Sequence, residues 1–73
     1  MTTDELARIF KDRYQKAPKG RVVTTIHLFG IEFASALAGK SIKEICARAD
    51  VPVSYHTEIH KGIRLAEYVS LKS

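Results

Sequence analysis

Residues 41–69 read SIKEICARADVPVSYHTEIHKGIRLAEYV, and this stretch decides the fold. Ser41 and Glu44 have the spacing of a capping box, so a helix is predicted to begin here. Pro52 predicts the end of that helix, because a residue before proline is pushed out of the α region. A second helix is predicted to restart near Ser54. The stretch therefore predicts two short helices joined by a tight turn.

Both predicted helices are apolar on one side only. The residues that share that side at helical spacing are Ile42, Ile45, Cys46 and Ala49 in the first helix and Ile59, Ile63 and Ala66 in the second. Polar and cationic side chains crowd the rest of the second helix. A short helix, a turn and a polar second helix form the arrangement that helix-turn-helix proteins present to the DNA major groove.

The first half of the chain predicts two further helices. Thr2 and Glu5 have capping-box spacing, and a helix is predicted from Thr3 to Ala17. From Arg21 to Ala38 the β-branched residues would suit a strand, but the apolar spacing favours one continuous helix. That spacing joins Val22, Ile26, Phe29, Phe33 and Leu37, and Gly39 is the expected helix C-cap.

Together these segments predict an all-α fold, a bundle of roughly four helices that contains a helix-turn-helix. Residues 1–73 are expected to form a single domain, with residues 1–38 as a helical platform and residues 41–67 as the helix-turn-helix unit. The ending 67–73 alternates weakly, and it either finishes the last helix or forms a short edge strand.

Leu28 and Ile31 fall on the side of their helix opposite the main apolar stripe. A helix that is apolar on two sides is either wrapped by its neighbours or shared with another subunit. Since so short a chain offers few neighbours, we expect Leu28 and Ile31 to form a homodimer interface. A fully wrapped central helix is the alternative.

The composition favours an anionic partner. The chain of 73 residues has a formal net charge of +4, and this excess is spread evenly over its two halves. Arg13, Lys16, Lys19 and Arg21 form a basic run that is either a solvated loop or a phosphate contact. No run approaches the ~18 apolar residues of a membrane span and no signal peptide is recognised, so we expect no membrane partner and a cytoplasmic location.

Residues 41–66 resemble the bihelical unit of bacterial and phage helix-turn-helix regulators. Asp50 stands where these motifs usually carry glycine, and Asp visits the left-handed region more readily than most residues. The whole chain also resembles a group of small bacterial helix-turn-helix-like proteins, through residues 17–20 (APKG), 26–31 (IHLFGI) and 57–62 (TEIHKG). This resemblance implies a DNA-binding type of fold and supplies no operator, ligand or reaction.

If the second helix is a recognition helix, its exposed N-terminal part faces base edges. The candidates for base contacts are Ser54, Tyr55, His56, Thr57 and His60, and those for phosphate contacts are Lys40, Ser41, Lys43, Lys61 and Arg64. Glu58 would repel a nearby phosphate. It either accepts a hydrogen bond from cytosine N4 or caps the start of the helix.

Catalytic and metal sites find little support. No nucleophile elbow, phosphate loop or paired-carboxylate cluster occurs, so no catalytic residue and no cofactor is predicted. His56 and His60 have the spacing of a metal-binding pair but lack a third ligand nearby, so no metal site is predicted. The single cysteine, Cys46, excludes an internal disulfide and is expected to be buried.

The leading hypothesis is a transcriptional regulator that binds specific double-stranded DNA sequences as a homodimer and is not an enzyme. The alternative is an adaptor domain that uses the helix-turn-helix scaffold to bind protein, because a fold does not fix a function. The acidic residues interleaved with the bases in residues 41–67 keep this alternative open.

Overall fold

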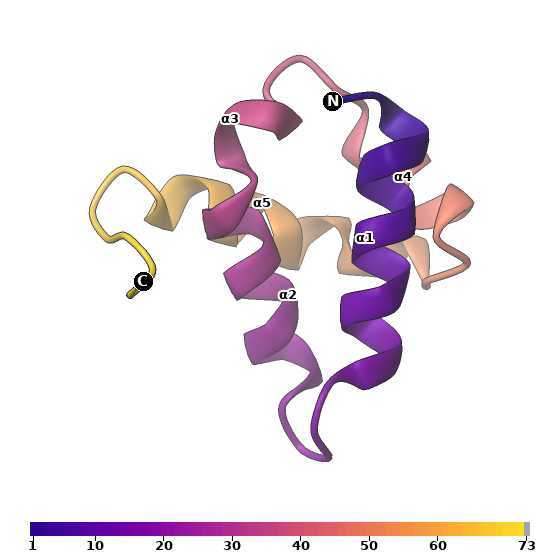
Figure 1. The fold of residues 1–73 in the computed structure, drawn as a ribbon, viewed down its shortest axis with the longest axis horizontal. Helices are drawn as coiled ribbons and strands as arrows, with labels where there is room; N and C mark the ends of the chain where they lie inside the picture. The colour runs from indigo at the N-terminus through magenta and orange to yellow at the C-terminus, as the bar shows by residue number, and fades with distance from the viewer. Residues whose placement is uncertain (73) are drawn as a thin grey trace.

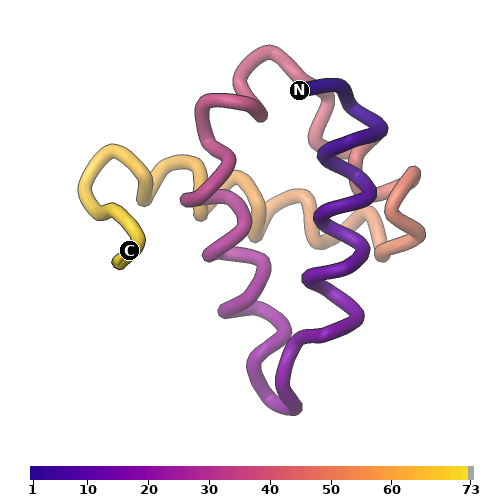
Figure 2. The backbone as a smooth tube through the Cα atoms, in the orientation of Figure 1, coloured from indigo at the N-terminus to yellow at the C-terminus, as the bar shows by residue number. Residues whose placement is uncertain are grey.

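The computed structural model describes residues 1–72 of the chain and is helical throughout its regular structure (Figure 1). The helices are α1 (Thr3–Lys16), α2 (Val22–Glu32), α3 (Ala34–Leu37), α4 (Ile42–Arg48) and α5 (His56–Leu65), and a single 3-10 turn, η1 (Val53–Tyr55), precedes α5. Helices α1 and α2 form an antiparallel pair, and α5 crosses behind this pair (Figures 1 and 2). The predicted all-α fold is confirmed.

Helix α1 begins as the sequence predicts. The Thr2 N–H donates to Glu5 Oε1 at 2.8 Å, and the Glu5 N–H donates to Thr2 Oγ1 at 3.1 Å, which completes the capping box. The helix ends at Lys16, one residue before the predicted end. Gly20, with φ 79°, then turns the chain into α2, and the Arg21 N–H donates to the Pro18 carbonyl at 2.9 Å.

The predicted continuous helix over Arg21–Ala38 is wrong at Phe33. That residue leaves the helical region at φ −107° and ψ 19°, so α2 and α3 are separate. The bend is compatible with dense packing, because the Phe33 ring lies 5.2 Å from the Phe29 ring and 5.6 Å from the Arg13 guanidinium. Beyond the bend, Leu37 is buried. The Phe33 N–H still donates to the Phe29 carbonyl at 3.0 Å, and the Leu37 N–H donates to the Phe33 carbonyl at 2.8 Å. The aromatic packing at Phe33 therefore accompanies a change in backbone angles that apolar spacing alone does not predict.

The helix-turn-helix begins and turns with identifiable backbone chemistry. The Ser41 hydroxyl accepts from the Glu44 N–H at 3.3 Å and caps α4. At the other end Asp50 adopts φ 60°, its N–H donates to Ala47, and the Val51 N–H donates back to Cys46. This is the Schellman arrangement with Asp at the position that favours glycine.

The second helix of this unit begins slightly later than predicted. Residues near Ser54 form the 3-10 turn η1, in which the Tyr55 N–H donates to the Pro52 carbonyl at 3.0 Å. The α-helical ladder of α5 starts at His56. Pro52 lacks a backbone N–H, and the chain passes through the tighter turn before the α-helix begins.

The core is a single apolar cluster that draws on every helix. Its largest fully enclosed members are Leu6, Phe10, Ile26, Phe29, Leu37, Ile45, Cys46 and Ile59. Phe10 and Phe29, from α1 and α2, lie with ring centroids 4.8 Å apart. The apolar sides that the sequence predicts for α4 and α5 both face this cluster.

Two glycines allow α2 and α5 to cross in backbone contact. A Cβ placed on Gly30 would lie 2.6 Å from the Ile59 carbonyl oxygen and 2.9 Å from the Gly62 Cα. A Cβ on Gly62 would collide with the His27 carbonyl oxygen. This crossing fixes α5 against the platform and thereby sets which of its faces points outward.

The C-terminal segment forms no strand within residues 1–72. After α5, the Tyr68 and Val69 N–H groups donate back to the Leu65 carbonyl at 2.9 and 3.0 Å, so the chain turns instead of extending. The suggested short edge strand is therefore wrong for the described residues, and Ser73 lies outside them. None of the described helices is long and apolar enough to cross a membrane.

Candidate nucleic-acid interface

Helix α5 has an inner side against the core and an outer side in solvent. Ile59 and Gly62 are buried on the inner side. Thr57, His60, Lys61 and Arg64 are all exposed and recur at helical spacing on the other side. We call these four residues the outer stripe. All four are among the residues that the sequence predicts to contact DNA.

The start of α5 places small polar groups beside the outer stripe. Ser54 is exposed in η1. The Thr57 hydroxyl donates to the Ser54 carbonyl at 3.2 Å and so orders the first turn of the helix. Ser54 and Thr57 are both exposed residues, and small polar side chains suit contacts with base edges.

Tyr55 and His56 occupy different positions from the outer stripe. Both are half-buried. The Tyr55 ring packs against Tyr14 of α1, with centroids 6.0 Å apart, and against the core cluster. The His56 ring meets the edge of the His60 ring at 5.9 Å. Of the five predicted base-contact residues, Ser54, Thr57 and His60 are therefore the most accessible.

Glu58 is turned towards the platform. Its Oε1 accepts from His27 Nε2 of α2 at 2.7 Å, and its Oε2 lies 3.5 Å from Lys61 Nζ. The hydrogen bond from His27, together with the charge of Lys61, holds the pKa of the Glu58 carboxyl below its usual value. Glu58 thus ties α5 to α2, a role that sequence reasoning missed.

Three of the predicted phosphate-contact residues lie at or just before the N-terminal end of α4. Lys43 is exposed and Lys40 is half-buried. Ser41 is exposed, and its hydroxyl oxygen already caps α4. Glu44, on the same helix, is held by Arg48 at 2.9 Å, and Arg48 also binds Asp4 of α1 at 2.6 Å.

Folding pairs most carboxylates and leaves many cations unpaired. Asp4, Asp12, Glu32, Glu44 and Glu58 all take part in ion pairs. Arg13 and Lys16 of the predicted basic run bind Glu32 and Asp12. Among residues 1–72, no ion pair involves Arg8, Lys11, Lys19, Arg21, Lys40, Lys43, Arg64 or Lys72. The positive charge is spread evenly along the sequence, but after folding the surface carries more unpaired cations than unpaired carboxylates.

The two predicted dimer residues differ in their surroundings. Leu28 is 43% exposed, so the alternative of a fully wrapped helix does not hold at this position. Ile31 is half-buried and shares a surface groove with Ala66, Val69 and Leu71 of the C-terminal segment. The structure therefore leaves Leu28 open to a partner and partly covers Ile31.

The described residues contain no group of three or more His, Cys, Asp or Glu side chains placed to share a metal ion. His56 and His60 approach each other edge-on, and Cys46 is enclosed in the core. Burial raises the pKa of the Cys46 thiol, which disfavours the reactive thiolate.

Comparison with known proteins gives one result. A family model described as an HTH-like domain, that is, helix-turn-helix-like, matches residues 2–72. No curated protein and no solved structure gives a significant match to the chain. Because the family model spans nearly all of the 73 residues, the chain belongs to the HTH-like domain family.

Proposed function

We propose that this protein is a cytoplasmic transcriptional regulator that binds specific sequences of double-stranded DNA through the outer stripe of α5. The main structural support for this proposal is the orientation of that helix. Thr57, Lys61 and Arg64 point to solvent, while the only carboxylate of α5, Glu58, pairs with His27 of the platform. A helix that lays a polar and cationic side on the surface in this way suits entry into a major groove.

The proposed contacts fall into two classes. Ser54, Thr57 and His60 would read base edges, because hydroxyl and imidazole groups bond donors and acceptors in the major groove. Lys40, Lys43, Lys61 and Arg64 would hold phosphates and so supply affinity without sequence preference. Membership of the HTH-like domain family supports this assignment. No enzymatic activity and no cofactor form part of the proposal.

The proposal includes a homodimer formed through the outer side of α2. Leu28 supports it, because a large apolar side chain that is 43% exposed loses water contact when a second copy covers it. Sedimentation velocity of a Leu28→Glu, Ile31→Glu variant tests this contact. Wild type should sediment as a dimer and the folded variant as a monomer, whereas equal sedimentation of the two would exclude this interface.

DNA binding is tested by fluorescence anisotropy with a random-sequence duplex. If about four phosphates are neutralised per protomer, affinity should fall about 150-fold between about 50 mM and about 200 mM salt. Lys61→Ala should weaken binding to all sequences and reduce the salt slope by about one unit. Lys19→Ala, on the far turn between α1 and α2, is the matched control and should change neither quantity. No binding even at the lower salt concentration would refute the proposal.

Sequence preference needs a separate measurement. A selection of binding sites from random DNA should yield a preferred sequence for the wild type. Thr57→Ala should then lower the affinity for that sequence while leaving random-duplex affinity unchanged, because a base contact is lost and the phosphate contacts remain. Equal losses on both DNAs would show that Thr57 does not read a base.

A further inference from the structure

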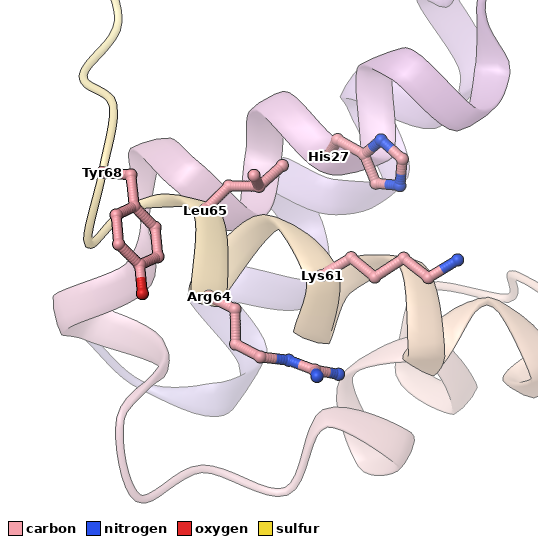
Figure 3. Close-up of a pocket in the computed structure, with 5 residues that line it drawn as sticks. All are labelled: His27, Lys61, Arg64, Leu65 and Tyr68. Atoms are coloured by element: carbon pink, nitrogen blue, oxygen red, sulfur yellow. The ribbon is translucent and has the colours of Figure 1, made fainter.

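A groove lies at the C-terminal end of α5, where this helix meets α2 (Figure 3). Its lining consists of His27 from α2 together with Lys61, Arg64, Leu65 and Tyr68, and its volume is about 280 Å³. His27 stands on the opposite wall from Arg64, and Tyr68 closes one end (Figure 3). Leu65 and Tyr68 have no role in the proposed DNA contacts.

The floor of the groove is apolar. Leu65 is 42% exposed and Tyr68 is 81% exposed, so both offer apolar surface to solvent. A backbone turn brings them together, since the Tyr68 and Val69 N–H groups both donate to the Leu65 carbonyl. Tyr68 and Leu65 therefore form one surface on which another apolar group can pack.

The rim of the groove is cationic. Lys61 and Arg64 extend along one side of it (Figure 3). Lys61 pairs with Glu58, which also binds His27, whereas no ion pair among residues 1–72 involves Arg64, and no carboxylate lines the groove. The groove thus combines an apolar floor with the unpaired positive charge of Arg64, and the ligand that suits it is an apolar group flanked by acids.

We propose that this groove binds an acidic segment of a partner protein, with one apolar side chain of that segment seated against Leu65 and Tyr68. A peptide suits the site better than a small molecule, because small-molecule sites enclose most of their ligand and this groove is open to solvent. A peptide spreads its contacts beyond the groove and orders Asp or Glu side chains opposite Lys61 and Arg64.

Such a partner would also compete with DNA. Lys61 and Arg64 belong both to the groove and to the outer stripe, so one set of cations cannot serve a phosphate backbone and an acidic peptide together. This regulatory consequence rests on the proposed DNA binding, whereas peptide binding itself does not.

The test uses a fluorescein-labelled peptide, Asp-Glu-Asp-Phe-Glu-Asp-Gly, titrated with the full chain. Two control peptides replace the acids by their amides or replace the Phe by Ser. The protein variants are Leu65→Ser and Tyr68→Ala, and the matched control is Val53→Ser, which removes an equally exposed apolar side chain (43%) from another element. Far-UV circular dichroism confirms that each variant is helical.

The groove account predicts that the acidic Phe peptide binds and that both control peptides bind more weakly. Leu65→Ser and Tyr68→Ala should each reduce its affinity at least about fivefold, because they remove the apolar anchor, while Val53→Ser should not. Loss of binding in Val53→Ser equal to that in Leu65→Ser would overturn the proposal. Binding of free 3-phenylpropionate with no binding of the peptide would also overturn it.

Failure of this proposal is distinguishable from failure of DNA binding. Leu65→Ser should weaken peptide binding by the same factor and leave the affinity for random duplex DNA unchanged, because Leu65 lies outside the outer stripe. If the protein binds the peptide but no DNA, the proposed groove stands and only the competition with DNA is refuted. If it binds DNA but not the peptide, the proposed groove is refuted and DNA binding stands.

Discussion

Helix α5 is positioned by a close helix crossing and by a left-handed turn, which place different steric demands on the residue that occupies them. At its crossing with α2, the backbones approach so closely that no Cβ fits, and both positions are glycine, Gly30 and Gly62. At the turn from α4, the chain needs a left-handed residue at an exposed position, and Asp50 supplies it at φ 60°. Steric exclusion by backbone atoms leaves only glycine, whereas a left-handed φ is also available to Asp at modest strain.

The helix crossing and the turn also control different aspects of the position of α5. The glycine crossing sets how closely α5 approaches the platform, and through His27 and Glu58 it adds a polar contact beside the crossing. The Asp50 turn sets the direction in which α5 leaves α4. The outer stripe depends on both, but substitutions at the crossing should have the larger effect on folding.

The largest effect is expected from Gly62→Ala. The added Cβ would meet the His27 carbonyl oxygen and the Gly30 Cα, and since these are backbone atoms, whole helices must separate. We expect the free energy of unfolding to fall by about 3 kcal/mol, even though Ala favours helices more than Gly does. Urea unfolding measures this change.

Gly39→Ala is the control for Gly62→Ala. Gly39 has φ 79° but open space around its Cα, so this substitution should cost only about 1 kcal/mol. If the two substitutions destabilise the protein equally, the cost of replacing glycine at both sites comes from backbone conformation and not from the close helix crossing.

The next effect is expected from Asp50→Val. A β-branched side chain is poorly tolerated at a left-handed φ, so the Schellman turn after α4 should be strained. We expect a loss of about 1.5 kcal/mol in the free energy of unfolding, measured by urea unfolding. Ala47→Val, at an exposed helical position three residues earlier, controls for β-branching alone and should cost less than half as much.

The ion pair at the crossing should appear as a pH dependence. Because the pKa of Glu58 is lowered in the folded protein, its contribution is present above the unfolded value near 4.5 and is lost as pH falls through the folded value. Wild type should therefore be more stable than Glu58→Gln at about pH 5.5, and this difference should narrow towards about pH 3.

Thermal unfolding of the two proteins across this pH range measures the effect. Glu67→Gln is the control, because Glu67 has no ion pair among residues 1–72, and its curve should follow that of the wild type. A constant difference between wild type and Glu58→Gln down to about pH 3 would show that the carboxylate charge is not what joins α5 to α2.

The smallest effect is expected from Asp50→Gly. Glycine relieves the strain of the left-handed φ, which stabilises the folded protein. It also adds conformational freedom to the unfolded chain, which lowers the free energy of unfolding, so the two effects partly cancel. We expect a gain of about 0.5 kcal/mol in the free energy of unfolding. A loss instead of a gain would show that the Asp50 side chain itself stabilises the turn.

Local sequence signals predicted the elements well, because their causes lie within a few residues. The capping box at Thr2, the Ser41 cap, the stop at Pro52 and the left-handed Asp50 all act through neighbouring backbone groups. At Ser41 only the serine half of the predicted capping box forms, because the Glu44 carboxylate binds Arg48. The apolar spacing of α4 and α5 likewise identified the sides that face the core.

Features that depend on contacts across the fold were not predictable in the same way. The break at Phe33 accompanies its packing against Arg13 of α1, which no local pattern encodes. The pairing of His27 with Glu58 and the half-burial of Tyr55 against Tyr14 arise only once the helices meet. The polar residues of α5 were recognisable, but which of them point outward depends on the Gly30–Gly62 crossing.

The central claim is that the outer stripe of α5 contacts DNA, and amide chemical-shift mapping tests it most directly. Random-sequence duplex DNA is added to the ¹⁵N-labelled protein at low salt. The largest shifts should fall on Ser54, Thr57, Lys61 and Arg64, with smaller ones at the start of α4. Shifts confined to α1 or to the surroundings of Leu28, or no shifts at all, would contradict the account.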